Sequence, residues 1–258
     1  MKVLFINDYS LPDVYKRCTN GIDHLAHTWG YDYFKQRAEV ECANINSKVI
    51  AFQKKIFTYK FIGDLSQEFQ ALFNYRDYDV VISANISVIS GLSYLKRFVK
   101  LPVLVGILHS VPSYKNEFAR ALLRSRLQGI DKIVCIARKD FEYLTEQLGL
   151  SAKQVIHLPW GANLADYDKQ LGTIDGQKPF IMSMGKSQRD YPTLIKAFER
   201  FSLDNWELKI FPGSSFSVES ASLKNIHVIR DWIRFKNAIP ILRSANFIVI
   251  PLVKSDRT

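Results

Sequence analysis

Short apolar runs rich in β-branched residues alternate with longer amphipathic stretches in the first two thirds of the chain. Helical spacing of apolar residues predicts helices at residues 64–75, 90–99, 117–128 and 139–148. The runs around them are KVLFIND, YDVVISAN, LPVLVGILHS, DKIVCIA and QVIHLPWG. Strands that alternate with helices form a parallel sheet with right-handed crossovers, and such sheets bind ligands beyond the carboxyl ends of their strands. The alternation therefore predicts an α/β protein with its site at strand ends.

A polar segment at residues 165–179 interrupts this alternation. It carries Gly172, Gly176 and Pro179 without helical or strand periodicity, which predicts a linker. The alternation restarts with FIMSM, WELKIFPG, IHVIR and ANFIVIPL. The sequence thus predicts two Rossmann-like domains in tandem, residues 1–170 and residues 178–258. The second domain is short and stops directly after a strand, so we expect it to be incomplete and the chain truncated. A naturally small second domain is the alternative.

Composition indicates a globular protein, because 258 residues with 47% hydrophobic content can bury a full core. No apolar stretch approaches the roughly 18 residues that cross a bilayer, and VLFI near the N-terminus is shorter than a signal-peptide core of about 7 to 15 residues. The three cysteines, Cys18, Cys42 and Cys135, have neither the even number of a disulfide framework nor the spacing of metal ligands. We therefore expect a cytoplasmic protein with ordinary thiols.

The formal net charge of +10 predicts an anionic partner: a nucleic acid, an acidic membrane surface or a phosphorylated small molecule. Residues 96–126 contain a single acid, Glu117. Their cations are Lys96, Arg97, Lys100, Lys115, Arg120, Arg124 and Arg126. A second stretch, KVIAFQKKIFTYKFI, interleaves lysines with aromatic residues, which suits an anionic membrane surface and equally a solvated face beside core aromatics. Zinc-finger spacing and RNA-binding aromatic signatures are missing, so we expect no nucleic-acid partner.

The segment IMSMGKSQRDYPTLIKAFE predicts a strand, a glycine loop and a helix that begins near Pro192. Gly185 would let a ligand approach the backbone, and Lys186 and Arg189 would add two positive charges. Backbone N–H groups at the start of a helix also favour anions, so the loop predicts a phosphate site. The alternative is that Gly185 merely ends the strand and that both cations are solvated.

Taken together, these segments resemble the GT-B glycosyltransferases, and within them family 4, the retaining nucleotide-sugar transferases. DKIVCIARKDFEYLTEQLG resembles the family's strand, serine and helix segment, with Ala137 in place of the serine. VIHLPWGANLADY is similar to its proline and glycine turn, in which Gly161 falls on the glycine while Trp160 and Asn163 replace the usual Asn and Asp. The resemblance covers nearly the whole chain.

The resemblance implies two Rossmann-like domains that face each other across a cleft, with the acceptor on the first and a nucleotide-sugar donor on the second. The Gly185 turn would hold the donor's diphosphate, with Lys186 at the family's usual Arg and Arg189 at or near its usual Lys. Cations stabilise the charge that builds on a departing diphosphate, so no metal is strictly required. No other cofactor is implied. Gly161 would also bind substrate.

His109 ends the run VLVGILH and matches a family histidine near the transferred sugar. The resemblance implies that its imidazole donates a hydrogen bond to a sugar hydroxyl or to the reacting oxygens. A histidine with a purely structural role is the alternative. Gly21 stands alone in NDYSLPDVYKRCTNGIDH, a loop in which many members have a glycine pair that receives phosphate and acceptor.

The implied reaction is transfer of a hexose, with retention, to a saccharide or lipid-linked acceptor in the synthesis of bacterial surface polysaccharide or glycolipid. The family's paired glutamates and its C-terminal helix would follow ANFIVIPL, so we expect this chain to have little activity by itself. A non-catalytic GT-B-like protein that binds a nucleotide or a membrane is the main alternative. A basic nucleic-acid-binding protein and an epimerase of the same fold are others.

Overall fold

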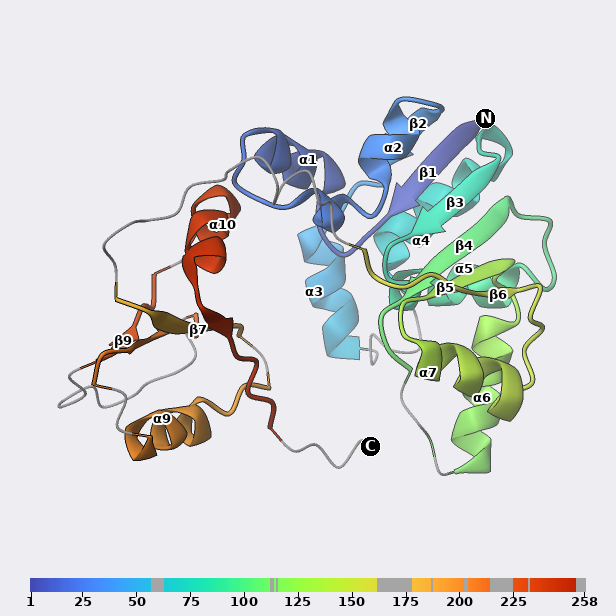
Figure 1. Ribbon diagram of the computed structural model, residues 1–258. Helices are drawn as coiled ribbons and strands as arrows, with labels where there is room; N and C mark the ends of the chain where they lie inside the picture. Colours follow the sequence, from blue (N-terminus) through green and yellow to red (C-terminus); the bar gives the residue numbers. More distant parts are fainter. Residues whose placement is uncertain are drawn as a thin grey trace. The chain divides into compact units, whose positions relative to one another are not determined.

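The structure is a computed structural model that describes residues 1–56, 63–111, 114, 116–161, 178–186, 188–201, 204–213, 225–231 and 233–253 (Figure 1). The chain divides into two compact units. Unit 1 contains Met1–Asn20 and His24–Ala162, and unit 2 contains Gly21–Asp23 and Asn163–Thr258. The predicted boundary between residues 170 and 178, and nearly all of the predicted linker, fall in the stretch 162–177, outside the described residues. They stay predictions.

Unit 1 contains a six-stranded parallel sheet in the order β2-β1-β3-β4-β5-β6. Its strands are β1 (Lys2–Ile6), β2 (Glu39–Cys42), β3 (Val80–Ser83), β4 (Val103–Leu108), β5 (Lys132–Cys135) and β6 (Val155–His157). Val3, Leu4, Phe5 and Ile6 are all buried, although neighbouring residues of a strand point to opposite faces of the sheet. Burial on both faces is typical of a parallel sheet that is covered by helices on each side.

Helices connect these strands and cover the two faces. They are α1 (Leu11–Thr19), α2 (Tyr31–Lys35), α3 (Ser47–Ile56), α4 (Leu65–Phe73), α5 (Ser90–Leu95), α6 (Glu117–Leu127) and α7 (Arg138–Glu142), with short turns η1 (Leu25–Thr28), η2 (Tyr75–Asp77), η3 (Ile86–Ile89) and the π-helical η4 (Tyr143–Gln147). Residues of α4, α5 and α6 pack with Leu4 and Leu104 on one face, and residues of α1 and α2 pack with Phe5 on the other. This confirms the predicted α/β class.

One segment of unit 1 differs from its sequence interpretation. The stretch after β1 is the helix α1 rather than a loop: the Ser10 hydroxyl accepts a hydrogen bond from the Asp13 N–H at 3.4 Å, and Pro12 lies in the first turn, where a missing N–H has no cost. The basic stretch from Lys48 contains the helix α3, and its continuation at residues 57–62 lies outside the described residues.

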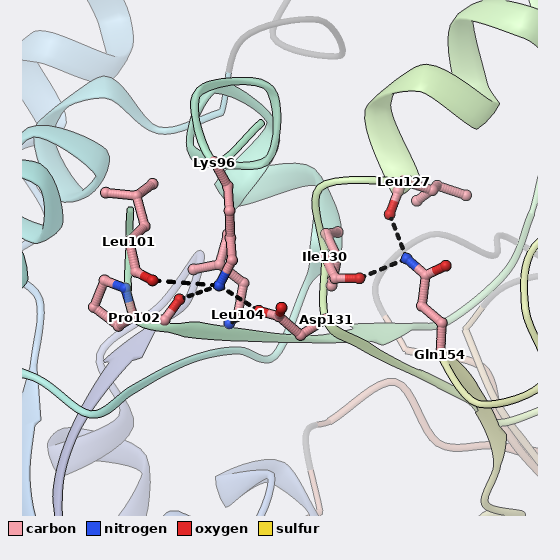
Figure 2. A network of polar contacts seen from close by, with 8 residues as sticks. All are labelled: Lys96, Leu101, Pro102, Leu104, Leu127, Ile130, Asp131 and Gln154. Carbon is pink, nitrogen blue, oxygen red and sulfur yellow. Dashed lines mark hydrogen bonds and ion pairs between the residues drawn. The ribbon is translucent and has the colours of Figure 1, made fainter. Parts of the chain in front are cut away.

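Lys96, one of the cations counted in the basic stretch, is part of a network of polar contacts at the start of β4 and β5 (Figure 2). Its ammonium group donates to the carbonyls of Leu101 and Pro102, and it lies 2.5 Å from the Asp131 carboxylate, which also accepts from the Leu104 N–H. Lys96 therefore links the starts of β4 and β5, and the Asp131 carboxylate balances its charge within the fold. The predicted basic stretch is not one continuous patch.

Unit 2 contains a four-stranded parallel sheet in the order β10-β7-β8-β9. Its elements are β7 (Phe180–Met184), α9 (Tyr191–Arg200), β8 (Glu207–Phe211), β9 (Ile226–Val228), α10 (Phe235–Ser244) and β10 (Phe247–Ile248). Figure 1 places α9 and α10 on opposite sides of this sheet. Accordingly, Ile195 of α9 packs with Ile210, whereas Ile241 of α10 packs with Phe211. All four predicted strands are present.

The segment Gly21–Asp23 also belongs to unit 2, although it lies far from the rest of this unit in the sequence. The Phe235 N–H at the start of α10 donates to the Ile22 carbonyl at 3.1 Å. At the other end of the unit, the edge strand β10 exposes Phe247 and Ile248. No helix in the described part of the chain combines the length and the apolar character that crossing a membrane requires.

Candidate functional site

The carboxyl ends of β1, β3 and β4 surround a cavity of about 350 Å³ in unit 1. These three strands are neighbours in the sheet, so the residues that follow them meet at one edge. The cavity is lined by Asn7, Tyr9, Trp29, Asn85, His109 and Ser110, among others. We call it the His109 hollow. The hollow therefore lies where parallel sheets bind ligands, and its polar side chains can form hydrogen bonds with a ligand.

A buried amide pair supports the β1 side of the His109 hollow. Asn7 is only 4% exposed. Its N–H donates to the Gln67 side-chain oxygen at 3.1 Å, and the Gln67 amide donates to the Asn7 carbonyl at 2.7 Å and to the Asp64 carboxylate at 2.7 Å. Each buried polar group of the pair thus has a partner, as burial demands. The contacts fix the backbone from which Asp8 and Tyr9 enter the hollow.

His109 lies at the end of β4 as predicted, and its exposed side chain lines the hollow. Its Nε2 is 2.7 Å from the Ala84 carbonyl oxygen. Because a carbonyl can only accept, Nε2 must carry a proton, and the neutral ring then presents Nδ1 as an acceptor. The predicted donation to a sugar would have to come from Nδ1 of a charged ring, because Nε2 is directed at the protein, and it stays a prediction. The neutral ring can accept a hydrogen bond from a ligand hydroxyl.

The aromatic side chains of Trp29, Trp160 and Tyr9 form a connected group beside His109. The Trp29 ring meets the His109 ring edge to face at 4.5 Å and the Trp160 ring at 5.0 Å. The Trp29 indole N–H donates to the Tyr9 hydroxyl at 2.5 Å, which in turn donates to the His27 carbonyl at 2.8 Å. Burial raises the pKa of the Tyr9 phenol, so this hydroxyl stays protonated and can donate.

Sequence reasoning did not identify Trp29 or Tyr9 as site residues. Trp29 has a φ of 54°, in the left-handed region that non-glycine residues seldom adopt. This conformation depends on tertiary contacts, which leave no periodic pattern in the sequence. The available signal was Tyr9, an aromatic residue that follows Asn7 and Asp8 just beyond the end of β1. Amphipathic rings of this kind suit the apolar faces and hydroxyl edges of a sugar.

Gly161 follows Trp160 at the β6 side of unit 1, and a Cβ atom there would meet no atom within 4 Å. Sterics therefore do not demand a glycine, and its role in binding stays a prediction. Gly21 belongs to unit 2, and it does not line the His109 hollow. Its φ is 67°, and a Cβ atom would lie 3.5 Å from the side chain of Lys236 in α10. Glycine adopts a positive φ more easily than other residues do, so the turn conformation accounts for a glycine at this position.

Unit 2 carries the predicted strand, glycine loop and helix as β7, residues 185–190 and α9. Gly185 has a φ of 141°, and a Cβ atom there would lie 2.6 Å from Nε of Arg189, so the arginine side chain crosses directly over the glycine. The Gly185 N–H donates to the Phe211 carbonyl at 3.2 Å, and its carbonyl accepts from the Tyr191 hydroxyl at 2.5 Å. These contacts hold the loop against the end of β8.

Lys186 extends from the same loop to the neighbouring strand end. Its side-chain carbons lie 3.6 to 3.9 Å from where a Cβ atom of Gly213 would be, and Gly213 has a φ of 70°. The structure thus brings Gly185, Lys186 and Arg189 together at the carboxyl edge of β7 and β8. Glycine backbone beside two cations is a chemically suitable place for phosphate.

The helix α9 begins next to Pro192, as predicted, and a residue of the chain itself caps its start. The Asp190 carboxylate accepts from the Thr193 N–H at 3.1 Å, and its carbonyl accepts from the Leu194 N–H at 3.2 Å. Pro192 has no N–H. The helix terminus is therefore capped by the protein's own carboxylate, as N-caps commonly are. Attraction for an anion at this loop falls mainly to Lys186 and Arg189.

Comparisons with known proteins establish the fold. No protein-family model matches the sequence, and no curated protein gives a significant match. Among solved structures, HepE of Anabaena in complex with UDP and glucose has a TM-score of 0.58 and 12% identity, over 98% of this chain and 74% of HepE. The N-terminal domain of Candida albicans trehalose-6-phosphate phosphatase has a TM-score of 0.52 and 12% identity, over 98% of this chain and 77% of that domain.

A second structure of HepE, in complex with UDP, has a TM-score of 0.53 and 16% identity, over 83% of this chain and 61% of HepE. Together with the two parallel sheets, these similarities show that the chain has the GT-B fold, as the resemblance of its sequence implies. Identities of 12 to 16% show the fold alone. The predicted cleft between the two domains stays a prediction.

Proposed function

We propose that this chain is a glycosyltransferase that moves a sugar from a nucleotide-sugar donor, bound by unit 2, to an acceptor bound by unit 1. One observation carries the proposal: Lys186 and Arg189 lie across two glycines of positive φ at the carboxyl edge of β7 and β8. In a GT-B fold, this is a suitable position for the donor's diphosphate. HepE, which shares the fold, has been solved with UDP and with glucose.

The chemistry of sugar transfer explains why positive charge is favourable beside the diphosphate. The acceptor's hydroxyl oxygen forms a bond to the anomeric carbon, and the bond from that carbon to the diphosphate breaks. The diphosphate keeps the electron pair, and the acceptor's proton passes to the departing phosphate oxygen. Negative charge grows on the diphosphate, so preorganised Lys186 and Arg189 stabilise the transition state more than the ground state. Metal is therefore not strictly required.

Unit 1 would supply the acceptor side. Nδ1 of neutral His109 can accept from a sugar hydroxyl, and the rings of Trp29 and Trp160 can pack on a sugar face. Hexose transfer, retention, family 4 membership and a role in surface polysaccharide or glycolipid synthesis belong to this proposal through the resemblance of the sequence. So do the substrate contacts predicted for Gly161 and Gly21.

An anionic membrane surface is a further proposed partner. In α3, Lys48, Phe52 and Lys55 are all exposed and follow one another at spacings of four and three residues, which places them on one side of the helix. The Phe52 side chain is 65% exposed. Cations beside an exposed ring suit an interface with anionic head groups.

The donor site is tested by calorimetry with UDP, and with GDP and ADP to cover the base. We expect the double variant Lys186→Ala/Arg189→Ala to bind the preferred nucleotide at least about a hundredfold more weakly, since each charge-assisted phosphate contact contributes roughly 1.5 to 3 kcal/mol. Lys196→Ala/Arg200→Ala removes the same charge from exposed positions of α9 and is the matched control.

Equal affinity in the wild type and the double variant would show that the two cations are merely solvated and would overturn the donor site. Nucleotide binding without sugar transfer would not by itself favour the non-catalytic alternative, because little activity is expected of this chain alone. Steeply salt-dependent binding of nucleic acid, with no nucleotide preference, would favour the nucleic-acid alternative.

A further inference from the structure

A second cavity of unit 1, of about 290 Å³, opens beside the His109 hollow. The two cavities share Ile86, Ser87, Leu108 and Ser110 in their linings, so they adjoin at η3 and the end of β4. We call the second cavity the α6 groove, because Ala119, Leu122, Leu123 and Arg126 of α6 form one of its walls. Nothing in the transfer of a simple sugar requires it.

The α6 wall is apolar near its N-terminal end. Ala119, Leu122 and Leu123 recur at spacings of three and four residues, so they share one face of the helix. Leu123 also packs against the core of unit 1. Opposite them, Ile86 and Leu108 are buried. The wall is thus attached to the sheet, and it offers hydrocarbon surface to an apolar chain.

A positive charge lies where the groove meets the hollow. Arg126 follows Leu122 and Leu123 by one helical turn, and its guanidinium donates to the Ile86 carbonyl at 3.3 Å. Ile86 lines both cavities, which places the guanidinium at their boundary. Burial lowers the pKa of Arg126, but a guanidinium keeps its charge in proteins. From the hollow outward, the lining is therefore polar, then cationic, then apolar.

We propose that unit 1 binds an amphiphilic acceptor, with a polar head in the His109 hollow, a phosphate beside Arg126 and a hydrocarbon chain in the α6 groove. The order of these three parts matches the order of chemistry across the two adjoining cavities. The proposal rests on the proposed function, because only a transferase has an acceptor. It favours the lipid-linked acceptor over the free saccharide. The binding itself does not depend on the donor site.

Calorimetry with three probes below their micelle concentrations tests this: farnesyl phosphate, farnesol and inorganic phosphate. We expect farnesyl phosphate to bind at least tenfold more tightly than either part alone. Ala119→Phe should fill the groove, and Leu122→Asn should make its wall polar, so each should weaken farnesyl phosphate at least tenfold. Arg126→Met should weaken farnesyl phosphate and leave farnesol unchanged.

The matched control is Phe118→Asn on the same helix. Phe118 is 76% exposed and does not line the groove, so this variant should bind as the wild type does. Circular dichroism and UDP affinity on every variant report whether it is folded. Should Arg126→Met fail to fold, Ala119→Phe still decides, because it removes no polar contact.

Equal affinity of all folded variants for farnesyl phosphate would overturn the proposal, as would phosphate that binds as tightly as farnesyl phosphate. If UDP binds and farnesyl phosphate does not, the amphiphile is excluded and the proposed transferase stands. If farnesyl phosphate binds as described and none of UDP, GDP and ADP binds, the groove is supported and the donor site fails.

Discussion

At the scale of single residues, His109 is defined by what its two ring nitrogens face. Nε2 is committed to the Ala84 carbonyl, and the ring edge packs on Trp29. A ring held in this way presents one acceptor in a fixed direction, which suits recognition of a hydroxyl better than proton donation. His24 is held through its other nitrogen, because its Nδ1 accepts from the Ala26 N–H at 2.9 Å.

We predict that neutral His109 is the tautomer protonated at Nε2. Two-dimensional ¹⁵N NMR of the imidazole at high pH distinguishes the two nitrogens, and Nδ1 should have the chemical shift of an unprotonated nitrogen. His24 is the internal control and should have the same tautomer, because its Nδ1 must accept. A proton on Nδ1 of neutral His109 would contradict the geometry and restore it as a donor to the ligand.

At the scale of elements, the sequence predicted what local pattern encodes. The strands β1, β3, β4 and β5 follow β-branched runs, and α9 follows from Pro192 and helical spacing. The strand β2 was missed because two acids, Glu39 and Glu41, interrupt it; they pair with Lys2 of β1 at 3.5 and 2.9 Å. The helix α10 was missed because Pro240 lies inside it.

The candidate site divides in the same way. Gly185, Lys186 and Arg189 are close in sequence, so their meeting could be predicted. Trp29 and Tyr9 meet His109 only after the chain folds. The capping of α9 by Asp190 was readable in principle, because an aspartate directly before Tyr-Pro is a common helix start.

The junction of α4 and α5 contains a buried acid. Glu68 is 5% exposed, and it accepts from the Leu92 N–H at 3.0 Å near the start of α5. A Cβ atom on Gly91 would lie 2.6 Å from its carboxylate, so a larger residue there would displace the carboxylate from its present position. Burial raises the pKa of Glu68 to about 7. Near neutral pH this carboxyl is therefore only partly ionised.

We predict that Glu68 makes the protein less stable as the pH rises. Its pKa is raised on folding, so its favourable contribution is complete below pH 4.5 and is lost as the pH passes 7. The shift corresponds to about 3 kcal/mol. Urea denaturation at several pH values should give Glu68→Gln a flatter stability profile than the wild type between pH 5 and 8.

Exposed Glu146→Gln serves as the control for loss of one carboxylate. Parallel profiles for the wild type and Glu68→Gln would mean that the acid is ionised throughout this range.

At the scale of the whole molecule, the net charge of +10 is distributed rather than gathered in one place. Lys96 is paired at the strand entrances, Arg120 pairs with Glu117, and Arg126 is turned toward Ile86. The exposed cations of α3, Lys48 and Lys55, lie outside the basic stretch at residues 96–126. Electrostatic attraction to a surface should therefore depend on particular elements more than on total charge.

We predict that the chain binds vesicles of phosphatidylglycerol and phosphatidylcholine, and that it binds phosphatidylcholine alone much more weakly. Lys48→Ala/Lys55→Ala should reduce binding about tenfold or more, because each cation near an anionic surface contributes roughly 1 kcal/mol. Phe52→Ser should reduce it too. Sedimentation with vesicles measures this. Phe73→Ser, which removes another exposed ring, is the control. Equal vesicle binding by the wild type and all of these variants would show that α3 does not form the membrane contact.

The edge-to-face stack of Trp29 has an optical consequence. The chain has four tryptophans, and two of them, Trp29 and Trp160, lie in contact with each other in unit 1 beside His109. An indole against an imidazole is a sensitive emitter, because its fluorescence changes when the neighbouring ring is protonated or displaced. The rim of the His109 hollow therefore contains its own fluorophore, and its emission reports occupancy without any label.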